Sequence, residues 1–133
     1  MPLQFELVSP EKALRSATVH QVVVPGTEGD FAVLETHAPV LSTIRPGAIE
    51  VYETASSPAE RIFIDGGFAE VNEKGLTILA ERAEPVADID VNALSEEITA
   101  AERAVEKAGS DGEKTIAERR LATLKAKRDV ASN

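Results

Sequence analysis

Histidines and cysteines are the first residues to consider, because their side chains carry much of the chemistry that proteins perform. The chain has two histidines, His20 and His37, and no cysteine. Thiol nucleophiles, disulfides and cysteine-ligated metals are therefore excluded. Neither histidine has a second one at the spacing of helical metal ligands. His20 lies in an expected strand, whereas His37 precedes Ala38-Pro39 in an expected turn and is the better candidate for a contact.

The segment GTEGD at residues 26–30 has the glycine content of a phosphate-binding loop. It lacks the lysine and the following serine or threonine that such loops use, and its two carboxylates would repel phosphate. Serines and carboxylates elsewhere match no nucleophile elbow or catalytic triad. We therefore expect a tight turn at this segment, no catalytic residues, no metal and no cofactor.

The charge balance limits the kinds of partner. The net charge is −9, which argues against nucleic acid and against unaided binding to anionic lipid. No segment approaches the roughly 20 apolar residues that span a bilayer. Residues 1–9 lack the basic-then-apolar pattern of a signal peptide. We expect a cytosolic chain without direct membrane insertion, whose association with a membrane would go through protein partners.

Up to about Glu84, polar and apolar residues alternate with the period of a β-strand. Short apolar runs are separated by glycine and proline turns, a pattern typical of an all-β sandwich or barrel. Arg45-Pro46-Gly47 predicts a tight corner. Asp65-Gly66-Gly67 predicts a hairpin turn, because glycine accepts a positive φ. We predict a β-sandwich of about ten short strands in residues 1–86.

After Pro85 the period becomes that of an α-helix. Asp90 is the expected N-cap, with Asp88 and Asn92 as competitors. The first helix then carries an apolar face formed by Leu94, Ile98, Ala101, Val105 and Ala108. A break at residues 109–112 precedes a second helix, expected from Glu113, with an apolar stripe formed by Ala117, Leu121 and Leu124.

So short a connection predicts an antiparallel helical hairpin in residues 87–133. Much of its apolar stripe is alanine, and a buried methyl contributes only about 0.8 kcal/mol. We therefore expect the two helices to pack weakly. Residues 113–133 carry a net charge of +3, because six basic residues face three acidic ones. This charge fits either a solvated helix end that complements the helix dipole or a contact strip for an acidic partner.

Three segments carry a resemblance to a known family. Residues 25–34 (PGTEGDFAVL) are followed by residues 35–39 (ETHAP) and by Pro46-Gly47, residues 66–71 read GGFAEV, and residues 76–80 read LTILA. Their order and spacing resemble the ε subunit of bacterial F-type ATP synthases, whose mitochondrial counterpart is called δ. The resemblance covers essentially the whole chain.

This resemblance implies a non-catalytic central-stalk subunit at the cytoplasmic face of the bacterial inner membrane. The β-sandwich would bind the foot of the γ subunit and rest on the c-subunit ring, helping to transmit proton-driven rotation to the catalytic αβ sites. Three residues carry over as partner contacts: Ser9, Asp30 and His37. Alternatively, Ser9 caps the turn before Pro10, and Asp30 satisfies local backbone donors.

The hairpin has two further implied roles. In some relatives it extends along γ and blocks ATP hydrolysis, with basic residues meeting an acidic segment of the β subunit. Here the corresponding charges would be Arg119, Arg120, Lys125, Lys127 and Arg128.

Some relatives also bind ATP where the hairpin begins, through Ile or Leu, Asp, two variable residues, Arg and Ala. Ile89 and Asp90 match this motif, but Ala93 replaces the arginine and Leu94 the alanine. The loss of the guanidinium argues against high-affinity ATP binding.

Two other readings of the sequence stay open at this stage. A free-standing module that binds a small molecule or carbohydrate would need aromatic residues on its loops, and the chain has one tyrosine and four phenylalanines. A small hydrolase would need a base, a nucleophile and oxyanion donors, which the sequence does not provide.

Overall fold

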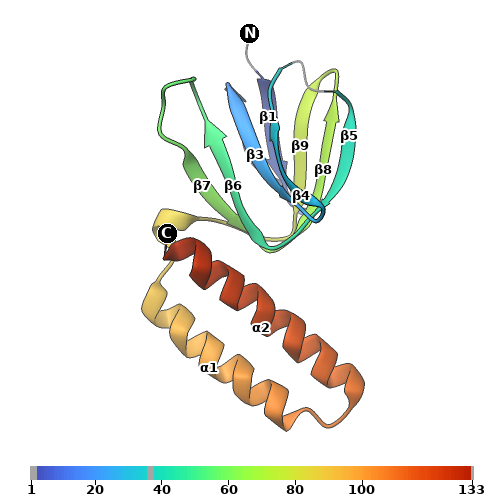
Figure 1. Cartoon of the computed structure of the whole chain (residues 1–133), viewed down its shortest axis with the longest axis vertical. Coiled ribbons are helices and arrows are strands. Elements are labelled where there is room, and N and C mark those ends of the chain that lie inside the picture. Colours follow the sequence, from blue (N-terminus) through green and yellow to red (C-terminus); the bar gives the residue numbers. More distant parts are fainter. Residues whose placement is uncertain (1–2, 36–37, 133) are drawn as a thin grey trace. The chain divides into compact units, whose positions relative to one another are not determined.

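The computed structural model describes residues 3–35 and 38–132. The chain divides into two compact units, residues 1–86 and 87–133 (Figure 1). In the described residues the first unit holds ten strands and the second holds two long helices. The predicted β-sandwich followed by a helical hairpin is therefore confirmed.

The strands are short and follow one another closely along the chain. Their bounds are β1 Leu3–Val8, β2 Ala13–Val19, β3 Gln21–Gly26, β4 Gly29–Val33, β5 Val40–Ile44, β6 Gly47–Tyr52, β7 Glu60–Ile64, β8 Gly67–Asn72, β9 Gly75–Ala80 and β10 Ala83–Pro85.

These strands form one curled sheet in the order β10-β7-β6-β3-β5-β8-β9-β1-β2, with β4 paired to β3. Figure 1 shows β6 and β7 on one side of the unit and β5 and β8 on the other. Along most strands buried and exposed side chains alternate, as in β1, where Leu3, Phe5 and Leu7 are buried. Seventeen buried apolar residues make one core cluster inside the curled sheet. The core is therefore formed by the inward-facing side chains of the alternating strands.

The segment Asp65-Gly66-Gly67 corrects one prediction. β7 pairs with β6 and β10, whereas β8 pairs with β5 and β9, so the segment is not a hairpin turn. It carries the chain from one part of the curled sheet to another. The positive φ expected of its glycines is present, at 121° for Gly66 and 151° for Gly67. The local conformation was therefore predicted correctly, but the strand pairing was not.

A side-chain link joins strands near the two ends of the sheet order. The Arg15 guanidinium in β2 pairs with the Glu60 carboxylate in β7. The hydrogen bond to Glu60 raises the pKa of Arg15 above its usual value, against the lowering effect of partial burial. A raised pKa favours the charged form of arginine, so Arg15 stays charged at any working pH.

The helices are α1 (Val91–Lys107) and α2 (Asp111–Ala131), preceded by a short 3-10 turn at Val86–Asp88. The Asp90 side chain accepts hydrogen bonds from the backbone N–H groups of Asn92 and Ala93, at 3.0 and 3.1 Å. Asp90 is thus the N-cap, as predicted. The second helix begins at Asp111 rather than at Glu113, because the Ser110 hydroxyl caps it by accepting the Glu113 N–H.

The hairpin has a small apolar core. Its buried residues are Leu94, Ile98, Ala101 and Leu124, with Ile89 and Leu121 partly buried against them. Four buried side chains hold two helices, whereas seventeen hold the β-domain. This contrast supports the expected weak packing of the hairpin. No helix in the described residues is long and apolar enough to cross a membrane.

Gly67 gives a direct test of the crossing between β7 and β8. A Cβ atom at Gly67 would lie 2.0 Å from the Leu79 carbonyl oxygen, whereas a Cβ at Gly29, also at positive φ, would meet nothing within 4 Å. We expect Gly67→Ala to lower the free energy of unfolding by on the order of 3 kcal/mol, and Gly29→Ala by roughly 1 kcal/mol. Urea unfolding of both variants measures the difference, and equal losses would contradict this account.

Candidate partner-binding surface

The strand register brings several turns to one end of the β-domain. Gly26, at the end of β3, lies opposite both Gly29 in β4 and Ile44 in β5. Ile44 in turn lies opposite Gly67 in β8, and Gly67 lies opposite Ala80 at the end of β9. We call this region the glycine end; it consists of residues 9–10, 26–30, 44–47, 65–67 and 80–82.

Ser9 belongs to the glycine end because β1 runs parallel to β9, with Val8 opposite Leu79. The Ser9 backbone N–H donates to the Lys12 carbonyl at 2.9 Å. Its hydroxyl donates to the same carbonyl at 3.2 Å and accepts the Lys12 N–H at 3.3 Å. The structure therefore agrees with the reading of Ser9 as a residue that closes the turn around Pro10. Its role as a partner contact stays a prediction.

Asp30 has a partner that the sequence analysis did not consider. Its Oδ1 lies 2.7 Å from Nη2 of Arg45, which follows β5. Nη1 of the same guanidinium donates to the Gly26 carbonyl at 2.9 Å. Asp30 is thus held by a residue 15 positions away rather than by the nearby backbone donors considered above. Ser9 and Asp30 share one end of the domain, as two contacts to one partner would require.

The two histidines contribute little to the described site. His37 lies outside the described residues, together with Thr36, so its contact role stays a prediction. His20 is half-buried between β2 and β3 rather than inside a strand, and its backbone N–H donates to the Tyr52 carbonyl at 2.8 Å. Within the described residues no cluster of His, Asp and Glu could hold a metal ion.

Exposed apolar side chains line the outside of the sheet beside the glycine end. Leu41, Phe68 and Leu79 are 73%, 50% and 43% exposed, and we call these three residues the outer apolar face. Phe68 lies directly opposite Leu79 in the β8–β9 pair and opposite Thr43 in the β5–β8 pair. Large apolar side chains side by side on the water-facing side of a sheet mark a surface for another molecule.

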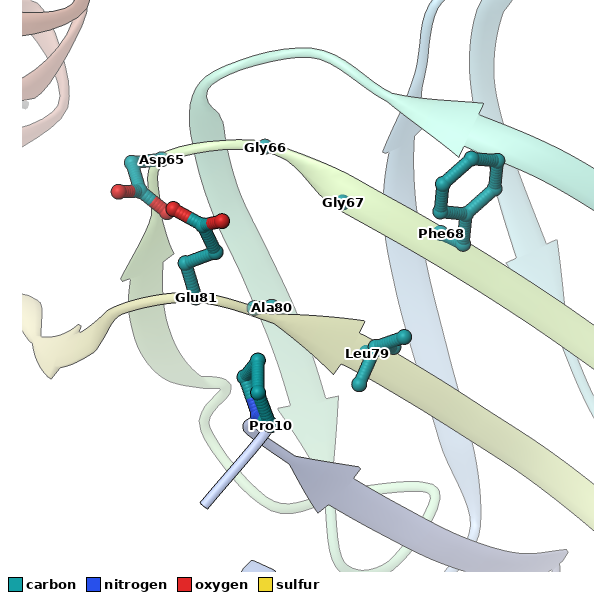
Figure 2. A pocket seen from close by; sticks show the side chains of 8 residues that line it. All are labelled: Pro10, Asp65, Gly66, Gly67, Phe68, Leu79, Ala80 and Glu81. Atoms are coloured by element: carbon teal, nitrogen blue, oxygen red, sulfur yellow. The ribbon is translucent and has the colours of Figure 1, made fainter. Parts of the chain in front are cut away.

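A groove of about 370 Å³ runs along this face into the glycine end. Figure 2 shows Phe68 and Leu79 on one side of it and the carboxylates of Asp65 and Glu81 on the other. Pro10, next to Ser9, also lines it. The surface therefore offers apolar contact area beside two carboxylates.

The outer apolar face was not predicted from the sequence, although the signal was present. Side chains in a strand point alternately to opposite faces. Ala69 and Ile78 are fully buried, so their neighbours Phe68 and Leu79 must point outward. An apolar residue on the face that otherwise carries Glu70 and Thr77 could have been recognised from this alternation.

The residues of the hairpin that match the ATP motif lie at the start of α1 and in the hairpin core. Asp90 caps α1, and Leu94, at the position of the motif's alanine, is only 2% exposed in the hairpin core. Ile89 packs partly against the same core. The remnant of the ATP motif therefore serves the local structure of the hairpin.

The basic residues of α2 are mostly exposed; Lys127 is half-buried and has interactions of its own. At about 100° per residue, Arg120 and Lys127 share one flank of the helix and Lys125 and Arg128 share the other, with Leu124 between the flanks. Arg119 lies about 140° from Leu124 and belongs to neither flank. The contact of these basic residues with an acidic partner stays a prediction.

Comparison with known proteins identifies the family. Residues 2–86 match the family model described as ATP synthase, Delta/Epsilon chain, beta-sandwich domain. The chain belongs to this family. The resemblance drawn from residues 25–34 and 66–71 is thereby confirmed.

Relatives within the family are similar over almost the whole chain. An ATP synthase epsilon chain from Parvibaculum lavamentivorans is 50% identical, with 92% of each chain covered. Another from Maricaulis maris is 49% identical, covering 98% of this chain and 97% of the relative. Epsilon chains are accessory subunits of the ATP synthase and do not catalyse its reaction, so the expectation that the chain is not itself an enzyme is confirmed.

Solved structures show the same fold at lower identity. One chain of the Euglena gracilis mitochondrial ATP synthase (OSCP/F1/c-ring, rotational state 1) matches with a TM-score of 0.80 and 22% identity, covering 94% of this chain and 78% of that chain. One from the Tetrahymena thermophila mitochondrial ATP synthase (central stalk and c ring) matches with a TM-score of 0.65 and 15% identity, covering 96% and 95%. At these identities the two likenesses show that the fold is shared.

The altered motif at the start of the hairpin predicts no ATP binding. Position 93 carries no guanidinium, and Asp90 is already engaged with two backbone N–H groups. Titration calorimetry with ATP should therefore give no heat of binding at concentrations up to about 1 mM. Ala93→Arg is the matched comparison, because it restores the guanidinium at an exposed position and leaves the buried Leu94 in place. A measurable heat of binding to the unmodified chain below about 1 mM ATP would contradict the prediction.

Proposed function

We propose that this chain couples rotation of the c ring to the γ subunit and the catalytic αβ sites in a proton-translocating F-type ATP synthase. It acts at the cytoplasmic face of the bacterial inner membrane, as part of the complex. Support comes from its membership of the epsilon family and from its likeness to a chain of a solved central-stalk and c-ring assembly. The observation that carries the proposal is the outer apolar face. A coupling subunit must bind its partner firmly, and exposed apolar side chains provide area for such binding.

The foot of γ docks on the outer apolar face. A contact that transmits rotation must hold the two proteins together against a load, and buried apolar area contributes most of such affinity. Leu41, Phe68 and Leu79 provide that area on strands rather than on mobile loops. Asp65 and Glu81 at the side of the groove fix the register, since charged groups at the edge of an interface contribute specificity more than affinity.

The glycine end rests on the polar loops of the c ring. Ser9 lies in a turn and Asp30 lies near the start of β4, and such short polar side chains lose little conformational entropy on contact. His37 is assigned to the same contact from the family resemblance. The β-domain would then have an apolar contact with γ and a polar contact with the c ring, and the two adjoin at the groove, whose Asp65 and Glu81 belong to the glycine end.

The hairpin regulates ATP hydrolysis. Its small core gives a low free-energy cost for separating the two helices. Each helix begins with a side-chain cap, at Asp90 and Ser110, so each can remain helical after separation. In the extended arrangement the basic residues of α2 contact the β subunit, and the hairpin also lies against α.

Removal of the outer apolar face should weaken binding to γ. The double variant F68S/L79S loses two exposed side chains, and each is worth about 1.5–3 kcal/mol if fully buried by a partner. Because about half of each side chain is already buried, we expect a loss of affinity for purified γ of roughly tenfold to a hundredfold, measured by titration calorimetry, with an unchanged thermal midpoint.

The matched control is Leu34→Ser, which removes a leucine of similar exposure (40%) beyond the end of β4 and outside this face. The control should bind γ like the unmodified chain. Equal affinity of F68S/L79S and the unmodified chain would rule out this face as the γ site.

Deletion of residues 89–133 tests regulation by the hairpin. The β-domain has its own core of seventeen buried residues, so the shortened chain should fold and assemble. We expect the isolated ATP synthase complex with this chain to hydrolyse ATP severalfold faster, because the blocking element is absent. A full-length variant with Arg120 and Lys127 changed to glutamine separates the effect of charge from that of length. Unchanged hydrolysis after the deletion would refute the regulatory role.

A further inference from the structure

Arg45 ties together two turns that lie far apart in the sequence. Its guanidinium contacts the Asp30 carboxylate at 2.7 Å and the Gly26 carbonyl at 2.9 Å. Its backbone N–H donates to the Pro25 carbonyl at 3.0 Å. Arg45 thus contacts three residues around the β3–β4 turn: Pro25 through its backbone, and Gly26 and Asp30 through its side chain.

Thr43 adds a second tie beside the first. Its carbonyl accepts the backbone N–H of Thr27 at 3.0 Å, and the hydroxyl groups of the two threonines lie 2.6 Å apart. Between β3 and β5 the paired register consists of Gly26 opposite Ile44. Contacts of Arg45 and Thr43 therefore extend a strand pairing that is otherwise very short.

The ion pair itself contributes little to stability. The side chains of Arg45 and Asp30 are 47% and 58% exposed, and ion pairs as exposed as this one typically contribute about 0–1 kcal/mol. Its geometry is more informative than its energy. A guanidinium is planar and presents its N–H donors in a fixed arrangement. Because two of its nitrogens are engaged at once, Asp30 is held in one orientation while much of its carboxylate stays open to solvent.

We infer that Arg45 is the positioning residue for the Asp30 contact. It orients the Asp30 carboxylate before a partner arrives, so that binding does not have to order this side chain. The partner group that fits is a hydrogen-bond donor on a polar loop, because Arg45 compensates most of the charge of Asp30. This inference rests on the proposed contact between the glycine end and the c ring.

A double-mutant cycle tests the inference with the full-length chain. The assay measures binding of each variant to the purified ATP synthase complex from which this subunit has been removed. We expect Asp30→Ala and Arg45→Ala each to weaken binding about tenfold, and D30A/R45A to weaken it no more than the larger single change. Thermal midpoints should stay within about 2 °C of the unmodified chain, because the pair is exposed.

Two further variants separate positioning from structural support. Arg45→Lys keeps a cation near Asp30 but loses the planar fork, so its affinity should lie between those of Arg45→Ala and the unmodified chain. The exchange D30R/R45D restores an ion pair with the carboxylate on the other turn. Its thermal midpoint should stay within the same range of about 2 °C, and its binding should stay as weak as that of the single alanine variants.

Three results would overturn the inference. Unchanged binding by Arg45→Ala, additive losses in D30A/R45A, or full binding by D30R/R45D would each show that Arg45 does not act through Asp30. F68S/L79S, measured in the same assay, separates this failure from that of the proposed function. If F68S/L79S binds weakly while Arg45→Ala binds normally, only the role of Arg45 fails. If both bind like the unmodified chain, the proposed docking also fails.

Discussion

Close approach of backbones at the glycine end is the constraint on which the β-domain depends. At Gly67 the chain passes so near the Leu79 carbonyl that a Cβ would lie 2.0 Å from it, and a Cβ at Gly26 would lie 2.7 Å from the Gly29 carbonyl. These approaches let β7 and β8 occupy different parts of one curled sheet although only Asp65 and Gly66 separate them in the sequence. They also bring several turns together at one end of the domain. The outer apolar face lies on the strands beside these turns.

The residue types and their local spacing were sufficient to predict the strands and helices, but not which strands pair with each other. Alternation located the strands, and the change of period after Pro85 located the hairpin, because both signals depend on residues a few positions apart. Asp65-Gly66-Gly67 shows the limit. The residue types predicted the positive φ values that are observed, but strand pairing depends on the packing of residues far away in the sequence. A hairpin turn and a crossing between sheet regions can share one local signature.

The candidate site was predictable to a similar degree. Ser9 was correctly expected at a turn, and Asp90 was correctly chosen as the cap of α1. Asp30 was expected in a turn but lies in β4, where it is paired with Pro25. The link from Asp30 to Arg45 could not be found, because 15 residues and a strand separate the two and only the register brings them together. The outer apolar face could have been found, since Phe68 and Leu79 break the polar pattern of their side of the sheet.

The ion pair between Arg15 and Glu60 has a mechanical consequence. An open curled sheet twists easily, because its first and last strands can slide past each other along their length. Arg15 lies in β2, the last strand of the order, and Glu60 lies in β7, next to the opposite end. A tie between them resists this sliding, so it adds torsional stiffness even though its contribution to the free energy of folding is small. In the proposed coupling role, stiffness under torque determines how much of each rotational step reaches the next subunit.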